Sequence, residues 1–265
     1  MSNNTHSHAL ITGASSGIGA TYARRLAARG SDLILVARRA DRLDALAREL
    51  VDKFGVAVRT VVADLASDSG VSHVVEILTA DASIDMLVNS AGISGLGATV
   101  DLSPEVINAM LALNITALTR LSRAALPGFV ARNRGTIVNI GSVMAFHALP
   151  ITSTYSGTKA YVLLFSRGLQ DELKDTAVQV QAVLPAAVAT EIYDGSILPL
   201  DQIPTHLVMD VEAMVDAALA GLDRGESVTL PSVADLDLWT RYDAARDALF
   251  TASQTGTPAP RYGFE

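Results

Sequence analysis

Cysteine is absent from all 265 residues of the sequence. Without a thiol, disulfide bonds, thiolate catalysis and cysteine-ligated zinc are excluded. A chain with no cysteine suits a reducing compartment, and we expect no bound metal.

Long hydrophobic runs and basic tracts are also missing. The first residues, Met1–His8, have neither a basic start nor a long apolar stretch, and no later run is apolar enough to span a bilayer. The formal net charge of −8 opposes a nucleic-acid backbone, and no cluster of lysine and arginine offsets it. We therefore expect a cytoplasmic protein with no membrane or nucleic-acid partner.

The chain is rich in short apolar runs. Hydrophobic residues make up 49% and charged residues 18%, which fits one globular domain spanning residues 1–265. Between the apolar runs lie longer stretches with helical spacing, and this alternation is typical of βαβ units. The sequence predicts an α/β fold, a Rossmann-like doubly wound parallel sheet of about seven strands with helices on both faces. The predicted strands are His8–Thr12, Asp32–Ala37, Val56–Ala63, Ile84–Val88, Thr136–Ile140, Val178–Leu184 and Ser227–Leu230.

Three later helices and two irregular segments complete the predicted organisation. Helical spacing covers Asp101–Arg132 and about Thr154–Lys174, and a further helix at Asp235–Phe250 has no assignable role. Residues 189–210 lack a clear period, so we expect them to cover the substrate. Residues 255–265 are either a loose tail or an arm that crosses to a neighbouring subunit.

A glycine-rich turn follows the first predicted strand and precedes a helix, in the sequence Thr12-Gly-Ala-Ser-Ser-Gly-Ile-Gly19. Such a turn lets backbone N–H groups and the positive end of a helix approach a pyrophosphate. The Gly-x-x-x-Gly-x-Gly spacing differs from the general dinucleotide motif, and alone it would also fit a tight structural turn. The candidate cofactor contacts here are Gly13, Ser15, Ser16, Gly17, Ile18 and Gly19.

Three further motifs accompany this turn: Asp64-Leu65, Asn89-Ser-Ala-Gly92 and Pro185-Ala-Ala-Val-Ala-Thr190. Together with the turn they resemble the short-chain dehydrogenase/reductase family. The resemblance implies an Asp near the adenine, an Asn-Asn-Ala-Gly motif after the fourth strand, and a Pro-Gly-x-Val-x-Thr motif beside the nicotinamide. It assigns cofactor contacts to Asp64, Leu65, Asn89, Ala91, Gly92, Pro185, Val188 and Thr190.

Two residues depart from the family pattern. Ser90 replaces an asparagine at a position that we expect to be structural. Ala186 replaces a glycine, which would be costly if the backbone there required a positive φ.

The end of the second predicted strand selects the cofactor. NAD enzymes generally place a carboxylate there for the ribose, but this chain has Ala37 followed by Arg38 and Arg39. A guanidinium forms paired hydrogen bonds with a phosphate, so NADP(H) is preferred, with NAD(H) possible and Arg38 the stronger candidate. Alternatively, the two arginines are solvated charges, and Arg39 pairs with Asp41 or Asp44.

The candidate reacting groups are a tyrosine, a lysine and a serine. Tyr155 and Lys159 are four residues apart, so they share one face of a helix, and Ser142 follows the fifth strand. An ammonium group favours the phenolate; lowering a tyrosine pKa of ~10 by about three units takes roughly 4 kcal/mol. We expect Lys159, with the positive nicotinamide, to supply this, and both Tyr155 and Lys159 to contact the cofactor. Family resemblance adds Asn114, which would hold a water in the proton relay.

The predicted function is NADP(H)-dependent interconversion of a carbonyl and a secondary alcohol. The presumed cleft is mainly apolar, which favours an apolar small-molecule substrate. The family resemblance implies a homodimer or homotetramer that pairs the two long helices. Two alternatives stay open: a cofactor-binding regulator without activity, and an epimerase or dehydratase on the same fold. The apolar residues that flank the presumed cleft are Ile93, Leu96, Met144, Phe146, Leu149, Ile192, Ile197 and Leu198.

Overall fold

The computed structural model describes residues 7–194 and 196–263. The rest of the chain, including Gly195 of the predicted covering segment and the end of the predicted tail, lies outside the described residues.

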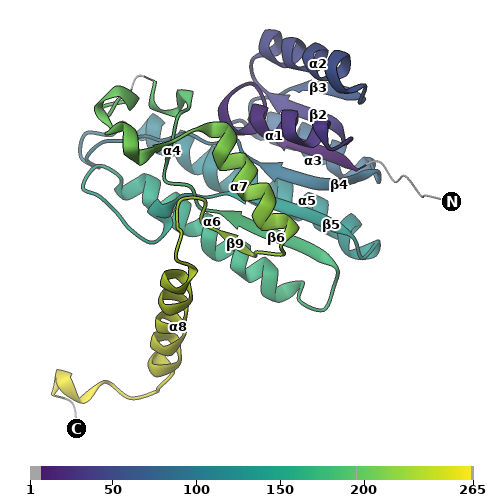
Figure 1. The fold of residues 1–265 in the computed structure, drawn as a ribbon. Helices are drawn as coiled ribbons and strands as arrows, with labels where there is room; N and C mark the ends of the chain where they lie inside the picture. Colours follow the sequence, from purple (N-terminus) through teal and green to yellow (C-terminus); the bar gives the residue numbers. More distant parts are fainter. Residues whose placement is uncertain (1–6, 195, 264–265) are drawn as a thin grey trace. The chain divides into compact units, whose positions relative to one another are not determined.

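A seven-stranded parallel sheet forms the centre of the fold, with strand order β3-β2-β1-β4-β5-β6-β9 (Figure 1). This confirms the predicted fold class. The order reverses between β1 and β4, and ligands of doubly wound sheets bind at such a point, beyond the carboxyl ends of the strands. The strands are β1 (His8–Thr12), β2 (Asp32–Ala37), β3 (Val58–Val62), β4 (Ile84–Asn89), β5 (Gly135–Ile140), β6 (Val178–Val183) and β9 (Val228–Thr229). A separate parallel pair joins β7 (Ala187–Val188) to β8 (Val208–Met209).

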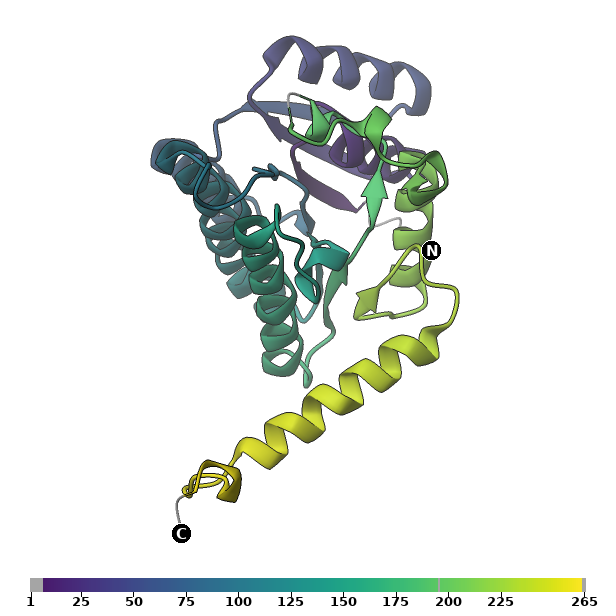
Figure 2. The ribbon, with the colours of Figure 1, turned by 90° about the vertical axis from the view of Figure 1, so that its left-hand side faces the viewer.

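Two layers of helices cover the two faces of this sheet (Figure 2). Buried residues of α1, α2 and α7 form one core with the sheet, and those of α3, α5 and α6 form the other. The helices are α1 (Gly17–Ala28), α2 (Ala40–Phe54), α3 (Asp68–Ala80), α4 (Pro104–Leu111), α5 (Leu118–Ala131), α6 (Ser153–Glu172) and α7 (Val211–Asp223).

The strands are almost wholly apolar because they supply both cores. In β2, Leu33 and Leu35 belong to the core under α1, whereas Ile34 and Val36 belong to the opposite core. Side chains alternate between the faces of a sheet, so a strand covered on both sides needs apolar residues at successive positions.

The helix predicted at Asp101–Arg132 is confirmed, with one irregularity. Ser103 caps its start by accepting a hydrogen bond from Val106 N–H at 3.4 Å, and the helix continues through α4 and α5. Between them, Ala112–Ala117 form a wider π-helical turn. Such turns are frequent at functional sites, and this one contains Asn114.

The chain divides into two compact units, and the second begins at Ser232. It consists of α8 (Leu236–Ser253), which confirms the predicted last helix, and a short 3-10 turn at Pro260–Tyr262. No residue of α8 is buried. Across residues 7–194 and 196–263, none of the helices is both long enough and apolar enough to traverse a bilayer.

Candidate active site

Thr12, the last residue of β1, ties the ends of β1 and β4 together. Its hydroxyl accepts hydrogen bonds from the backbone N–H groups of Ser90 and Ala91, each at 3.0 Å, and donates to Val88 O at 3.3 Å. The glycine turn and the loop after β4 are thereby fixed beside each other at the reversal of strand order.

Two glycines of the turn lie too close to other backbone atoms to carry a side chain. Gly13 has φ +68°, and a Cβ there would lie 2.9 Å from Ala91 Cα. A Cβ on Gly19 would lie 2.5 Å from Gly13 O. The floor of the site is therefore bare backbone at the start of α1, which is the arrangement a pyrophosphate requires.

A pocket of about 410 Å³ opens above this floor. It brings together most of the predicted cofactor contacts from the ends of β1, β2, β3 and β4. Those that line it are Gly13, Ser15, Ser16, Gly17, Ile18, Gly19, Arg38, Arg39, Asp64, Leu65, Ala91, Gly92 and Thr190.

Three predicted cofactor contacts lie behind the pocket wall instead. Asn89 is buried, and its amide donates to Ser122 Oγ at 3.0 Å and to Asn139 Oδ1 at 2.9 Å. Val188 is buried in β7, and Pro185 O accepts a hydrogen bond from Val143 N–H at 3.0 Å. These side chains support the wall, and none of them lines the pocket.

The structure bears on the two departures from the family pattern. Ser90 lines the pocket, and the expectation that its position is structural stays a prediction. Ala186 is unstrained, because Asn133 is the only residue other than glycine with a positive φ among those the structure describes.

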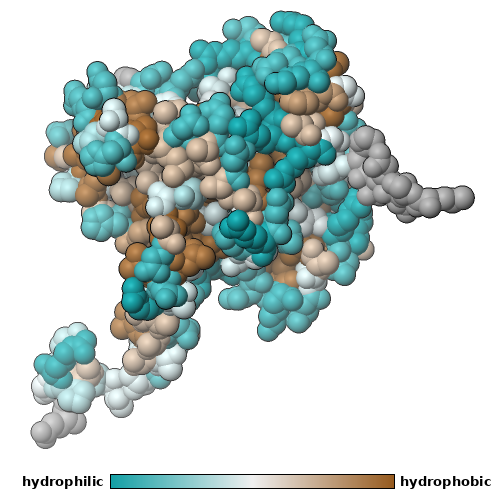
Figure 3. All heavy atoms as spheres, viewed as in Figure 1, coloured by the Kyte–Doolittle hydropathy of each residue, from teal (hydrophilic) through white to brown (hydrophobic). Residues whose placement is uncertain are grey.

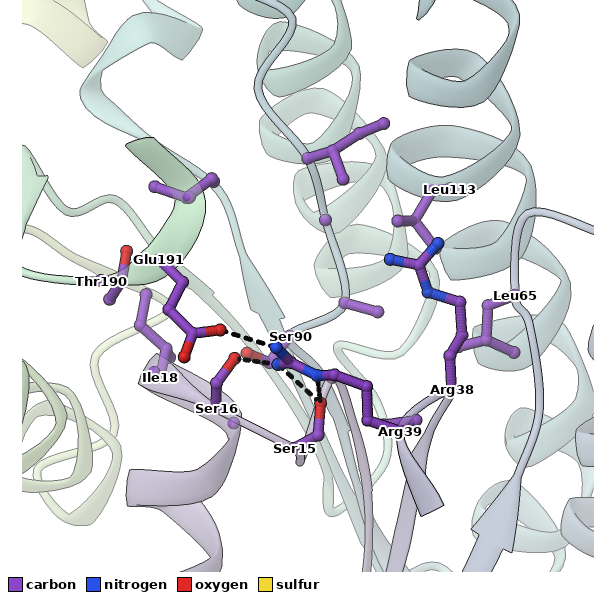
Figure 4. Close-up of a pocket in the computed structure, with 18 of the residues that line it drawn as sticks. Ser15, Ser16, Ile18, Arg38, Arg39, Leu65, Ser90, Leu113, Thr190 and Glu191 are labelled. Atoms are coloured by element: carbon purple, nitrogen blue, oxygen red, sulfur yellow. Dashed lines mark hydrogen bonds and ion pairs between the residues drawn. The ribbon is translucent and has the colours of Figure 1, made fainter. Parts of the chain in front are cut away.

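An acidic residue, Glu191, also lines this pocket and was not among the predicted contacts. Glu191 pairs with Arg39 at 2.8 Å (Figure 4) and with Arg42 at 2.6 Å. These two hydrogen-bonded guanidinium groups lower the pKa of Glu191 to about 2. Nothing in the local sequence signals this contact, because Glu191 and Arg39 are 152 residues apart. The pocket also includes Ala37, Ala63, Ile93, Ser94, Leu113, Ile192 and Asp194, which were not predicted as cofactor contacts.

The two predicted arginines have different surroundings. Arg39 donates to Ser15 Oγ at 3.1 Å and to Ser16 Oγ at 2.7 Å, and it pairs with Glu191, not with an aspartate of α2 as the alternative supposed. Arg38 is exposed and extends along the other wall towards Leu113 (Figure 4). No hydrogen bond or ion pair within the described part of the chain engages it.

Tyr155 and Lys159 lie one turn apart on α6, as the sequence predicts. Lys159 Nζ is 5.6 Å from the centre of the Tyr155 ring and donates a hydrogen bond to Ile140 O at 2.9 Å. Burial lowers the pKa of Lys159 to about 8.

The chain itself favours a protonated phenol at Tyr155. Burial raises its pKa, the nearby Tyr193 adds to this, and a hydrogen bond with Ser142 acts in the opposite direction. With a pKa of about 8, Lys159 is still mostly charged at neutral pH, so it remains able to favour a phenolate. The sequence-based expectation that Lys159, with the positive nicotinamide, stabilises the phenolate stays a prediction.

Ser142 and Asn114 are both buried beside this pair. Ser142 caps a short 3-10 turn, Val143–Ala145, and its hydroxyl accepts from Met144 N–H at 3.2 Å. Asn114 uses both amide protons, donating to Ile93 O at 2.9 Å and Thr158 Oγ1 at 3.1 Å.

Asn114 also lies beside the backbone of Gly92 and Ile93, which line the pocket. Its Oδ1 accepts from Ile93 N–H at 3.0 Å, which leaves one lone pair for a water or another donor. A Cβ on Gly92 would lie 3.3 Å from Asn114 Oδ1 and 3.8 Å from Lys159 Nζ. Gly92 therefore joins the pocket to the predicted catalytic residues, which are not themselves part of its lining.

The site as a whole fits a nicotinamide dinucleotide. At its centre, glycines leave the backbone bare, which allows a pyrophosphate to approach closely. One end of the pocket carries Arg38, and at the other end Gly92 lies beside Lys159.

Comparison with known proteins agrees with this geometry. The sequence model described as short chain dehydrogenase matches residues 7–197. A short-chain dehydrogenase from Sphingobium yanoikuyae, solved in complex with NADPH, is 47% identical, with 96% of this chain and 98% of that chain covered and a TM-score of 0.93. The bulky-bulky ketone specific alcohol dehydrogenase from Comamonas testosteroni is 42% identical, with 98% and 99% covered and a TM-score of 0.89.

Curated relatives include a very-long-chain 3-oxoacyl-CoA reductase from Anas platyrhynchos, which is 35% identical over 188 residues. The match covers 69% of this chain but only 60% of that longer protein. From the match over residues 7–197 and the similarity along nearly the whole chain, we conclude that this protein belongs to the short chain dehydrogenase family.

Proposed function

We propose that this enzyme reduces bulky apolar ketones to secondary alcohols with NADPH. The observation that carries the proposal is the grouping of Tyr155, Ser142 and Lys159 at the Gly92 end of the dinucleotide pocket, where burial raises the pKa of Tyr155 and so favours its protonated form. A protonated phenol is a proton donor, so the resting site is prepared for the reduction of a carbonyl.

The chain's own residues bind the carbonyl and supply the proton. Ser142 and Tyr155 hydroxyls hold the substrate oxygen, and Tyr155 donates its proton as negative charge develops there. Lys159 stabilises the phenolate that remains, and a proton from solvent, passed by a water bound at Asn114 Oδ1, would restore the phenol. The bound nicotinamide supplies the hydride equivalent.

NADP(H) is the cofactor, and Arg38 is the residue that we assign to its 2′-phosphate. Arg38 has no partner among the described residues and lines the pocket, so its planar guanidinium is available for a phosphate. The relative from Sphingobium yanoikuyae was solved with NADPH, which supports the assignment.

Apolar side chains around the catalytic residues favour a bulky ketone. Phe146, Leu149 and Ile197 are 39%, 43% and 61% exposed, although they lie in or next to the loops that flank the site. Hydrophobic residues gather over these loops on the face shown in Figure 3, whereas the corner formed by α2 is largely hydrophilic. The Comamonas testosteroni relative is described as specific for bulky-bulky ketones, which fits such a surface.

A 3-oxoacyl thioester is the second candidate substrate, since reductases of that kind are 35% identical to this chain. A coenzyme A substrate carries phosphates, but the sequence has no lysine or arginine at residues 143–158 or 192–210, which bear these apolar side chains. We therefore favour the uncharged ketone.

A substrate panel separates these candidates. NADPH oxidation is followed with a diaryl or long-chain aryl ketone, with acetone as a matched small ketone, and with a long-chain 3-oxoacyl-CoA. We expect kcat/KM for the bulky ketone to exceed that for acetone by at least about 100-fold, because apolar burial contributes about 0.8 kcal/mol per CH₂. Equal values for the two ketones, or a clear preference for the thioester, would overturn the proposed substrate class.

The assembly is proposed to be a homo-oligomer. No residue of α8 is buried, and its Leu249 and Phe250 are 72% and 60% exposed. Large apolar side chains exposed in this way are typical of subunit interfaces. The location in the cytoplasm and the absence of membrane and nucleic-acid partners stay predictions.

A further inference from the structure

Glu191 holds a position that suits an anion. Its carboxylate oxygens accept hydrogen bonds from Arg39 at 2.8 Å and from Arg42 at 2.6 Å. The same Arg39 donates to the hydroxyls of Ser15 and Ser16 on the glycine turn (Figure 4). Two guanidinium groups and two hydroxyls beside a helix N-terminus are the donors that a phosphate would use. We call Glu191, Arg39 and Arg42 the Glu191 cluster.

The cluster also connects two parts of the chain. Glu191 belongs to a short turn, Glu191–Tyr193, that follows the last family motif, whereas both arginines lie at the start of α2. A second contact joins this turn to the pocket, because Ser94 Oγ donates to Ile192 O at 3.0 Å. The backbone of residues 190–194 is thus held against the pocket at two points.

We propose that Glu191 is a built-in competitor for the 2′-phosphate of NADP(H). Arg39 lines the same pocket as Arg38 and is the second guanidinium that we assign to this phosphate. The carboxylate and the phosphate bind Arg39 alternately, so that Glu191 weakens binding of the phosphorylated cofactor while it fastens residues 190–194 over the pocket. This role rests on the proposed binding of NADP(H) and not on which carbonyl compound is reduced.

The charges and exposure of the cluster support competition rather than cooperation. A carboxylate bound to Arg39 repels a phosphate that approaches the same guanidinium. Glu191 is 43% exposed and its partners 39% and 44%, so solvent weakens each ion pair and makes exchange feasible. NADH lacks the 2′-phosphate and would not compete.

The test compares Glu191→Gln with wild type by titration with NADPH and with NADH, using the fluorescence of the reduced cofactor. Loss of the competing carboxylate should tighten NADPH binding by about 3- to 10-fold, the range for removing one or two exposed ion pairs, with NADH changed less than about 2-fold. Unchanged or weaker NADPH binding would show that Glu191 does not compete. An equal gain for both cofactors would exclude the 2′-phosphate as the competing group.

Glu49→Gln is the matched control. Glu49 forms a similar two-point pair with Arg24 at 2.8 and 2.9 Å, is 40% exposed and lies outside the pocket lining, so this variant changes the net charge equally. It should leave the dissociation constants of NADPH and NADH unchanged. If Glu49→Gln tightened NADPH binding as much as Glu191→Gln does, the change in net charge alone would explain the effect, and the proposal would be wrong.

Hydrogen exchange without any cofactor tests whether Glu191 holds residues 190–194 against the pocket. Amides in peptides covering residues 190–194 should exchange faster in Glu191→Gln than in wild type or Glu49→Gln. Equal exchange in all three proteins would show that Glu191 does not fasten this segment.

Discussion

Burial determines the chemistry of the active site at the scale of single residues. Lys159 is buried against a carbonyl, so its pKa falls to about 8, and burial also raises the pKa of Tyr155. The sequence predicted that both residues share one face of a helix, and the structure has them one turn apart on α6; their catalytic roles stay predictions. The sequence could not predict which protonation state the interior favours, because that depends on the packing of β5 and the loop after β4 around them.

The first prediction concerns Lys159 and the pH dependence of stability. Its pKa is about 8 in the fold and 10.5 for the free side chain, so between these limits the unfolded chain binds more protons and stability rises with pH. The free energy of unfolding of wild type, relative to Lys159→Met, should rise by at most about 3 kcal/mol between pH 8 and 10.5. Urea denaturation at several pH values measures this difference. A difference that is flat or falls with pH would mean that burial does not lower the pKa of Lys159.

A second prediction concerns Arg38. Arg38→Gln should weaken NADPH binding by about 10- to 100-fold and leave NADH binding nearly unchanged, because a charge-assisted pair with a phosphate contributes about 1.5–3 kcal/mol. Direct titration with both reduced cofactors measures the effect. Arg48, an exposed arginine of α2 outside the pocket, provides the control as Arg48→Gln. An equal loss of affinity for NADPH and NADH would show that Arg38 does not bind the 2′-phosphate.

At the scale of elements, the sequence predicted what local periodicity determines. All seven predicted strands of the main sheet are present, although the third is shorter, at Val58–Val62. Periodicity did not predict the π-helical turn at Ala112–Ala117 or the short strands β7 and β8. These depend on distant partners, as does the Asn89 side chain, whose hydrogen bonds reach β5 and α5.

The third prediction concerns the glycine turn. Gly19→Ala should abolish cofactor binding or weaken it by more than about 100-fold, because its Cβ would meet Gly13 O at 2.5 Å and the turn would have to move. Gly168→Ala in α6, where a Cβ meets nothing within 4 Å, is the control and should bind NADPH normally. Normal binding by Gly19→Ala, measured by titration, would show that the turn is not the cofactor floor.

At the scale of the whole molecule, the family motifs predicted the site from residue 10 to residue 190, and little beyond it. The chain from Ser232 onward is a separate unit whose helix was predicted but whose role was not. Because no residue of α8 is buried, its packing within this chain gives no indication of that role. The function of such a helix depends on a partner that a single sequence does not contain.

The fourth prediction follows from the exposed apolar residues of α8. Replacing Leu249 and Phe250 together by serine should shift the protein to a smaller oligomer, because each buried side chain of this kind contributes about 1.5–3 kcal/mol to association. Light scattering after size exclusion measures the mass, and the exposed pair Leu236 and Leu238 provides a second double variant. An unchanged mass for both variants would show that α8 does not contribute to the subunit interface.

The most direct test of the proposed chemistry is the turnover of a bulky aryl ketone with NADPH by wild type and Tyr155→Phe, with cofactor binding measured in both. We expect the variant to bind NADPH within about 3-fold of wild type but to lose turnover by at least about 10³-fold, because only the proton donor is removed. Turnover by Tyr155→Phe at a rate near that of wild type would contradict the role of Tyr155 as the proton donor.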